Sequence, residues 1–480
     1  MSGALSTSAA ERRRFLAPLA LAQFICSFAG SNMNVMINDI TEDLDTTVQG
    51  VQAAITLFLL IMAILMIPCS KLTDRWGRKR CFTAGLVLYG IGALLSALSP
   101  GLGVLILGNS VFEGVGTALL IPPVYILTTL HFSDLTSRAR AFGVISGMGG
   151  IGAAAGPLIG GLITEAITWR AAFVFQAAVV ALIVVLSRRI EDPIAADPTR
   201  PFDGVGAILS AVGMFCIVFG ILQADSNGAL MAAFLAVGAA LLLWFFLHIR
   251  GRERADKEPL LSTGLFKNRA SNLGLVTQNI QWLLLMGTSF AVAVFLQTVR
   301  GYNAIETGVI FTAATLGVLG SSLAAERLAK RRRQKTLIVA GFVMTVAGIG
   351  LLLALVGASS RVVAFAPGLL LIGLGLGVML TPSVNLVQSS FPEQQQGEIS
   401  GLSRSVSNLG SSLGTAIAGT ILISDLASGN TTYVLAMVVL AAIGLIGLAA
   451  AARLPRGPEP PGTSSELIST HPPPPAIQRG

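Results

Sequence analysis

The sequence predicts an all-α membrane protein in which fourteen transmembrane helices form two six-helix bundles, with two extra helices between them. Hydrophobic residues make up 53% of the 480 residues and charged residues only 12%, whereas about 25% of a soluble domain is charged. Apolar segments long enough to cross a bilayer recur along the whole chain. Lysine and arginine concentrate in every second connection between these segments, which is typical of multi-pass proteins.

The apolar segments give the helices in order. A hydrocarbon core of about 30 Å needs about 20 apolar residues in each helix. The predicted spans are residues 15–38, 51–69, 81–98, 103–129, 141–165, 170–187, 203–223, 229–249, 271–298, 304–326, 335–357, 361–386, 397–424 and 431–452.

The basic residues assign the two sides of the membrane. An even number of spans puts both termini on one side, and all but four of the 32 lysines and arginines lie on that side. The exceptions are Arg170, Arg300 and Arg361 on the opposite side and Arg404 within a span. Because basic loops stay in the cytoplasm, we expect a multi-pass protein of the inner or plasma membrane with cytoplasmic termini. The net charge of +8 then reflects topology and contact with the lipid bilayer, and no nucleic-acid binding is expected.

The loops divide the chain into blocks. The predicted blocks are a cytoplasmic N-terminus (1–14), a six-helix bundle (15–190), a linker with two extra helices (191–249), a cytoplasmic loop (250–270), a second six-helix bundle (271–452) and a disordered, proline-rich cytoplasmic tail (453–480).

The two six-helix bundles share features at nearly the same offset. A basic loop at 71–79 has a counterpart at 327–335, and the Gly152–Gly156 pair has a counterpart in Gly410–Gly414. These repeats indicate an internal duplication. Paired six-helix halves with a ligand site between them are a transporter architecture.

No catalytic or metal-binding pattern is present in the sequence. The three histidines do not cluster with acids or cysteines, and we interpret the four cysteines, which lie in or at the ends of apolar segments, as packing residues. The expectation is therefore a monomeric protein that is not an enzyme, has no cofactor and no metal, and binds a small-molecule substrate.

A stripe of small residues marks the fifth span. Gly152, Gly156 and Gly160 recur every four residues, with Pro157 and Gly161 beside them. Such stripes let two membrane helices approach closely, and proline is tolerated only where neighbours satisfy the freed carbonyl. The stripe predicts a close-packed interface that can kink.

Several motifs, in order and at the expected spans, resemble the major facilitator superfamily, and most closely its 14-span drug:proton antiporter branch. They are DRWGRKR (74–80), GAAAGPLIGG (152–161), WRAAF (169–173), FDGVGAILS (202–210), GLFKNR (264–269) and FLQTVRGYNAIETG (295–308). The resemblance implies export of amphipathic or cationic small molecules by alternating access, in exchange for protons. One alternative is an exporter or facilitator of one endogenous metabolite or lipid with weak or no proton coupling. Another is a membrane sensor or scaffold that does not transport.

The resemblance also implies two moving parts. Asp74 and Arg78, with Arg75 and Gly77 between them, would form a charge latch that engages a helix of the second half. The glycine stripe would pack against the span at 304–326 and act as the hinge about which the halves rock. Static close packing is the alternative for the stripe, and a purely topological role is the alternative for the basic loop.

Polar residues on one face of the first span predict a cavity wall. Helical spacing places them on one face, which would line the cavity or contact a partner helix: Gln23, Ser27, Ser31, Asn34 and Asn38. Gln278 and Gln281 are predicted to line the same cavity from the second half. Arg404, with Asn408 one turn later, either holds an anionic substrate group or pairs with an acid.

Two acids are candidates for proton coupling. Glu113 lies within the fourth span, where a carboxylate is costly and usually functional. Asn109, a further candidate for the cavity lining, shares its face. Desolvation favours the protonated form of Glu113, which could therefore load and release a proton; a structural acid is the alternative. Asp39, in an acidic outer loop, is the second candidate. The acid and the arginine that the antiporter branch carries are replaced here by Ala29 and Ser110, which puts ordinary coupling in doubt.

Overall fold

A computed structural model describes residues 9–132, 135–190, 192, 196–199, 201–224, 227–329, 332–358, 362–392, 395–423 and 430–455. Within these ranges the chain forms helices and no β-strand. Fourteen of the described helices are long and apolar enough to cross a membrane, which confirms the predicted number of spans. Residues 1–8 of the predicted N-terminus and 456–480 of the predicted tail lie outside the described residues.

Each half of the molecule supplies six spans. All of them are helices, because an isolated helix satisfies its own backbone hydrogen bonds in lipid. The first half contains α1 (Ala9–Asn32), η1 (Met33–Val35), α2 (Ile37–Asp43), α3 (Val48–Trp76), α4 (Arg78–Ala97), α5 (Leu102–Leu105), η2 (Ile106–Glu113), α6 (Gly114–His131), α7 (Leu135–Ala166) and α8 (Trp169–Ser187). The second half contains η3 (Thr263–Lys267), α11 (Arg269–Val294), η4 (Phe295–Val299), α12 (Ala304–Ala329), α13 (Gln334–Ala358), η5 (Val362–Phe365), α14 (Ala366–Gln388), α15 (Gln396–Ile423) and α16 (Asn430–Ala452). Between the halves run α9 (Gly204–Leu222) and α10 (Gly228–Arg254).

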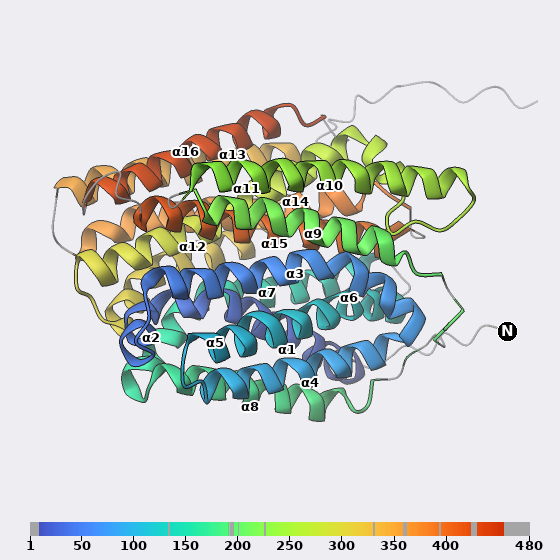
Figure 1. Ribbon diagram of the computed structural model, residues 1–480, viewed down its shortest axis with the longest axis horizontal. Coiled ribbons are helices and arrows are strands. Elements are labelled where there is room, and N and C mark those ends of the chain that lie inside the picture. Colours follow the sequence, from blue (N-terminus) through green and yellow to red (C-terminus); the bar gives the residue numbers. More distant parts are fainter. Residues whose placement is uncertain are drawn as a thin grey trace, which may run out of the picture.

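The two halves repeat the same helix packing. Within the halves, α1 packs on α7 and α11 packs on α15; between the halves, α3 packs on α15 and α7 packs on α12. In Figure 1 the two halves lie side by side, blue to teal and yellow to red. A Cβ at Gly152 would collide with the backbone oxygen of Phe24, and a Cβ at Gly410 with that of Asn279. The glycines that suggest a duplication therefore make the equivalent contact in each half.

The extra helices cover one seam between the halves. Helix α9 packs against both α3 and α15, where Val218 joins Leu60 and Ala416 in an apolar cluster. Helix α10 packs mainly on α9 and leaves most of its apolar surface exposed, as suits a helix that faces lipid. The green ribbons of Figure 1 show this pair lying along the side of the bundle.

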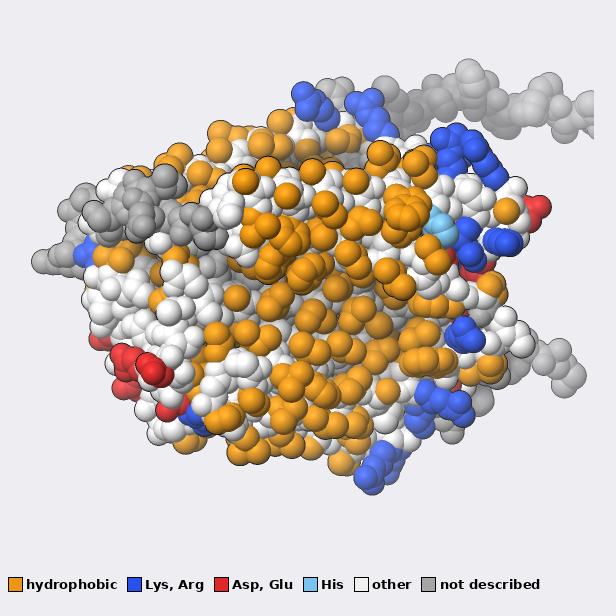
Figure 2. Space-filling view, viewed as in Figure 1, with side chains coloured by type: hydrophobic (Ala, Val, Ile, Leu, Met, Phe, Trp, Pro, Cys, Tyr) orange, Lys and Arg blue, Asp and Glu red, His pale blue; other side chains and the backbone are white. Residues whose placement is uncertain are grey.

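The surface divides into an apolar belt and two charged ends. Figure 2 shows hydrophobic side chains over the middle, Lys and Arg gathered at one end and Asp and Glu at the other. We call the end that carries most of the lysines and arginines the basic end; it includes Lys71 and Arg75. We call the opposite end the acidic end; it includes Asp39 and Glu42. The belt is what a bilayer core requires of a spanning bundle.

Asp203 fastens the extra helices at the basic end, where its side chain is almost fully buried. Its carboxylate accepts hydrogen bonds from the backbone N–H groups of Gly206 at 3.0 Å and Leu260 at 3.2 Å. His248 Nε2 lies 3.0 Å away and Arg252 Nε 3.6 Å away. Burial alone raises the pKa of Asp203, but these hydrogen bonds and the Arg252 charge together lower it below its ordinary value.

We expect Asp203→Ala to destabilise the protein by about 3 kcal/mol at neutral pH, because buried partners lose their acceptor. Asp203→Asn keeps the helix cap and should cost less. Since the folded pKa is lowered, the stabilisation is present above the unfolded value of about 4 and is lost as the pH falls through the folded value. Thermal unfolding of detergent-solubilised protein at neutral and acidic pH measures this. A gap between wild type and Asp203→Ala that stays constant with pH would contradict it.

Candidate functional site

A cavity lies at the centre of the molecule, between the two halves. It contains about 510 Å³ of space not filled by protein atoms, a figure that includes space open to solvent. Both halves contribute to its described lining, which consists of Gln23, Cys26, Ser27, Gly30, Leu59, Met62, Met66, Ile121, Ala153, Trp282, Met286, Arg404, Ser407, Asn408 and Ser411.

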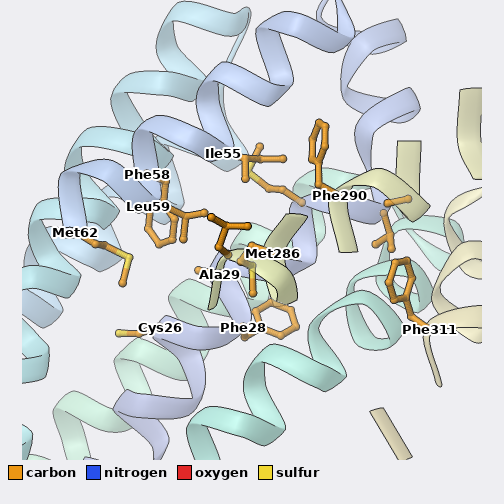
Figure 3. Packing of buried hydrophobic residues seen from close by; sticks show 14 of the residues in the cluster. Cys26, Phe28, Ala29, Ile55, Phe58, Leu59, Met62, Met286, Phe290 and Phe311 are labelled. Carbon is orange, nitrogen blue, oxygen red and sulfur yellow. The ribbon is translucent and has the colours of Figure 1, made fainter. Parts of the chain in front are cut away.

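Most of this lining is apolar and adaptable. Leu59, Met62 and Met66 of α3 line it together with Trp282 and Met286 of α11. Figure 3 shows labelled side chains from α1, α3 and α11 gathered around this centre. Methionine side chains are flexible and polarizable, and they fit ligands of irregular shape. Such a wall can accommodate the apolar body of a small molecule.

Only part of the polar face of α1 reaches this cavity. Gln23 and Ser27 line it, and Gln23 Nε2 donates to Ser27 Oγ at 3.2 Å. Ser31 is buried instead against the glycine stripe and donates to the backbone oxygen of Phe28. The polar face is therefore shared between the cavity and a helix interface, the two roles that the sequence left open.

The end of the polar face forms a contact between the halves. Gln297 of η4 donates through Nε2 to the backbone oxygen of Asn34 at 2.7 Å. Its own backbone oxygen accepts from Asn38 Nδ2 at 3.0 Å, and its Oε1 accepts from the Asn38 N–H at 3.2 Å. Asn34 and Asn38 thus join η1 and α2 to the second half toward the acidic end, and neither is among the described residues that line the cavity.

Three other predicted cavity residues are placed elsewhere. Gln278 exchanges hydrogen bonds with Ser403 and Ser407 at 2.9 Å each, within the second half. Gln281 accepts from Ser383 at 2.9 Å. Asn109 lies in η2 beside Glu113. None of the three is among the described residues that line the cavity in this structure, to which α11 contributes Trp282 and Met286.

Arg404 is the one charged residue among the described residues that line the cavity. It reaches from α15 to the first half, where its Nη2 donates to the Tyr125 hydroxyl and its guanidinium carbon lies 4.5 Å from the Tyr125 ring centroid. Tyr125 in turn donates to Gln23 Oε1 at 3.2 Å. Within the described part of the chain Arg404 forms no ion pair. The predicted pairing with an acid is therefore not observed there, and binding of an anionic substrate group stays a prediction.

Glu113 is fully buried inside the first half and does not line the cavity. It ends the π-helical turn η2, and such turns often mark functional sites. Asn109 Nδ2 lies 3.5 Å and Ser96 Oγ 3.4 Å from its carboxyl oxygens. Gly92 and Gly108 allow α4 and η2 to approach, since a Cβ on either would meet backbone atoms of the other helix. No described cation pairs with Glu113.

Asp39 occupies the first turn of α2 at the acidic end, outside the apolar spans. Partial burial is the main cause that raises its pKa, and the nearby carboxylates of Glu165 and Glu42 add to it. It is not among the residues that line the central cavity. Its place is therefore at the mouth of the bundle.

The glycine stripe of α7 serves two interfaces, which corrects part of its predicted role. Gly152, Gly156 and Gly160 face α1 of the same half, where a Cβ on each would meet Phe24, Ser31 or Asn32. Gly161 faces the backbone oxygen of Ala304, at the start of α12. The backbone oxygen of Pro157 lies against Gly308 of the same helix. The predicted contact with the span at 304–326 is therefore made by Pro157 and Gly161, not by the four-residue repeat.

The basic loop makes the predicted turn with a different ionic arrangement. Gly77 joins α3 to α4 with a φ of +96°, a backbone conformation that favours glycine. Arg78 pairs with Asp74 at 2.6 Å and lies 4.0 Å from Asp192, in the linker that follows the first half. Arg75 lines a small surface pocket beside Asp74.

The ion pair that joins the two halves at the basic end is made by Lys71. Its Nζ lies 2.7 Å from Glu398 of α15 and 3.0 Å from Glu258. Ser262 holds the other oxygen of Glu398 through its hydroxyl and its N–H, at 2.7 and 3.1 Å. This ion pair joins the halves at the basic end, where the latch was predicted for Asp74 and Arg78, which pair with each other.

We expect a double-mutant cycle of Lys71→Met and Glu398→Gln to give a coupling energy of about 1 kcal/mol, as for a partly buried ion pair. Thermal unfolding of wild type, both single variants and the double variant measures it. Lys71→Met paired with Glu258→Gln provides the comparison for the more exposed partner and should couple less. A coupling energy near zero for Lys71 and Glu398 would contradict a latch.

Sequence reasoning missed several residues of the site. Tyr125 carries the contact between the halves, and Trp282 and the methionines form the wall. Gln297 closes the acidic end. Tyr125 and Gln297 could have been found as polar side chains within apolar spans. Glu398 could have been found as an acid at the start of a span.

Comparison with known proteins identifies what the chain is similar to. The sequence model of the Major Facilitator Superfamily matches residues 19–415. The puromycin resistance protein of Streptomyces alboniger is 29% identical, over 85% of this chain and 81% of that protein. The multidrug efflux pump LfrA of Mycolicibacterium smegmatis is 28% identical, over 88% and 83%. The riboflavin transporter RibZ of Clostridioides difficile is 26% identical, over 83% and 85%.

Solved structures of similar fold include a POT family transporter in complex with a thioalcohol-conjugated peptide. It superposes with a TM-score of 0.69 at 15% sequence identity and covers 92% of this chain and 96% of that chain. At this identity the likeness establishes the fold alone.

Proposed function

Since this chain belongs to the Major Facilitator Superfamily, a family of transporters rather than enzymes, we propose that it exports amphipathic, drug-like small molecules by alternating access. The observation that carries the proposal is the central cavity between two equivalent halves. Drug resistance and efflux proteins among the similar sequences support the same direction of transport.

Contacts between the halves at both ends support a two-sided gate. Gln297 binds Asn34 and Asn38 toward the acidic end, and Lys71 binds Glu398 at the basic end. Opening one set while the other holds would expose the cavity to one side at a time. Both sets are polar and few, so that each can break at modest cost.

We propose Glu113 as the proton site of an exchange with protons. An ionised carboxylate without a cation partner is costly in a dry interior, and the groups that contact the Glu113 carboxyl, Ser96, Asn109 and Tyr89, are all neutral. Cys26, which lines the cavity, lies within electrostatic range of Glu113. Asp39, at the acidic end, is the site from which protons would enter.

A second candidate is transport of one metabolite or lipid with weak proton coupling or none. The separation of Glu113 from the cavity favours it, as does Ser110, which donates to the backbone oxygen of Ala54 at 2.8 Å and carries no charge.

Proteoliposomes distinguish these functions. Vesicles with an acidic lumen and inside-out protein should accumulate one or more members of a panel of cationic, neutral and anionic amphipathic dyes. A protonophore should abolish the accumulation if protons drive it. Movement only down the dye gradient, unchanged by the protonophore, would support the second candidate. No movement of any dye would argue against export.

The setting of this function is a further part of the proposal. We infer an inner or plasma membrane protein that acts as a monomer, with both termini in the cytoplasm. The positive-inside distribution supports this orientation, because the basic end carries Lys71 and Arg75 while the acidic end carries Asp39. The blocks 15–190 and 271–452 would be the two moving bodies, joined by 191–249 and 250–270, with 1–14 and 453–480 as cytoplasmic extensions.

A further inference from the structure

The structure assigns a charge preference to the central cavity: we propose that Arg404 binds the anionic group of an amphipathic substrate, such as a carboxylate on an aromatic or aliphatic body. This inference rests on the proposed export function and specifies its substrate class. It narrows the amphipathic or cationic class that the sequence resemblance implied to amphipathic anions.

The first support is the charge balance of the cavity. Arg404 is charged, and no aspartate or glutamate is among the described residues that line the cavity. A guanidinium in a site shielded from water attracts an anion strongly and repels a cation. Its planar fork of N–H groups also matches the two oxygens of a carboxylate. A cationic substrate would have no described acid to meet it there.

The second support is the set of unused donors around Arg404. Its described hydrogen bond goes to the Tyr125 hydroxyl, which leaves further N–H groups of the fork for a ligand. Asn408, one turn along α15, lines the same cavity. Trp282 lines it as well and carries one indole N–H. Neither of these side chains makes a hydrogen bond within the described part of the chain.

The third support is the way in which Arg404 is held. Tyr125 contacts the guanidinium through both its hydroxyl and its ring, and Tyr125 is fixed by Gln23. These contacts aim a second-half side chain at the first-half wall. An anion bound by Arg404 would therefore touch both halves. A ligand that touches both halves can shift the equilibrium between their two arrangements. Tyr125 is a positioning residue in this scheme.

The apolar remainder of the cavity fits the rest of such a molecule. Leu59, Met62, Met66 and Met286 line the same cavity as Arg404, and apolar side chains with a few polar groups are the usual lining of a small-molecule site. The predicted substrate therefore has an apolar body with one acidic group at its edge.

Three probes that share one aromatic body test the charge preference: naphthaleneacetate, its neutral amide naphthaleneacetamide, and naphthylmethylammonium. Binding to the full-length protein in detergent at neutral pH is followed by quenching of tryptophan fluorescence. The acetate should bind at least about tenfold more tightly than the amide, as expected for a charge-assisted hydrogen bond, and the ammonium should bind most weakly. Equal binding of all three, preference for the ammonium, or no binding of any would overturn the proposal.

Variants connect the preference to Arg404. Arg404→Gln should bring the acetate and the amide to within about twofold of each other, and Arg404→Lys, which keeps the charge but loses the planar fork, should retain only part of the preference. Arg453→Gln, which removes an exposed arginine that does not line the cavity, serves as the matched control and should leave the ratio unchanged. Size-exclusion profiles confirm that each variant is folded. An unchanged ratio in Arg404→Gln would overturn the assignment.

Vesicle transport of the same probes separates this proposal from the export function. Transport of the amide or the ammonium without preference for the acetate would leave export standing and overturn the charge preference. Selective binding of the acetate without any transport would uphold the site and argue against export.

Discussion

A Glu113→Gln protein is expected to lose the accumulation of substrate that a pH gradient supports, while it still moves substrate down its own gradient. A gradient of one pH unit supplies about 1.4 kcal/mol per exchanged proton, which corresponds to tenfold accumulation. Glutamine cannot release a proton, so that the ratio of lumenal to external substrate should fall from about tenfold per proton toward one.

Glutamine should be tolerated at this position because its neutral amide fits the same surroundings. Glu113 is fully buried beside Ser96 and Asn109, and Gly92 and Gly108 keep the space tight. An isosteric substitution leaves the packing of α4 on η2 unchanged. Loss of accumulation would therefore report proton chemistry rather than a collapsed helix interface.

The measurement uses proteoliposomes with an imposed pH gradient, and substrate exchange without a gradient as the reference. Asn109→Ala, which keeps the acid and removes one contact, is the matched control and should retain accumulation. If Glu113→Gln accumulated substrate as wild type does, Glu113 would be a structural acid. Asp39→Asn, tested in the same way, would then identify whether the acidic end carries the coupling.

Much of the fold could be predicted from the sequence because bilayer length and charge bias act on whole segments. Fourteen spans were expected, and fourteen helices of sufficient length lie in the described ranges. The repeat of small residues at Gly152 and Gly410 indicated a duplication, and these glycines make matching helix contacts in the two halves. Such signals depend on composition and spacing and need no knowledge of partners.

The partners themselves could not be predicted, because residues on one helical face still have several neighbours. The polar face predicted for the first span is divided among the cavity at Gln23, the stripe at Ser31 and the second half at Asn38. At the basic end Lys71 pairs with the second half, while Arg78 pairs with Asp74 on its own half. In each case the helical period correctly predicts which residues share a face. The packing of that helix against its neighbours then decides which group each residue contacts.

The two faces of the glycine stripe lead to the second major prediction. Gly152→Ala should destabilise the fold, because its Cβ would meet the rigid backbone oxygen of Phe24 within the first half. Overpacking of this kind costs about 1–3 kcal/mol, and Gly152→Val should cost more. Gly161→Ala meets the backbone oxygen of Ala304 across the two halves. It should leave the halves folded and disturb their closure at the acidic end.

Thermal unfolding and proteoliposome transport together separate the two roles. Gly152→Ala should lower the melting temperature, whereas Gly161→Ala should lower transport several-fold with a smaller thermal effect. Gly147→Ala, on the same helix, is the control and should change neither, because a Cβ at that position would have no neighbouring atom within 4 Å. If Gly161→Ala transported normally while Gly152→Ala did not, α7 would act through α1 alone, and the seam with α12 would be static packing rather than a hinge.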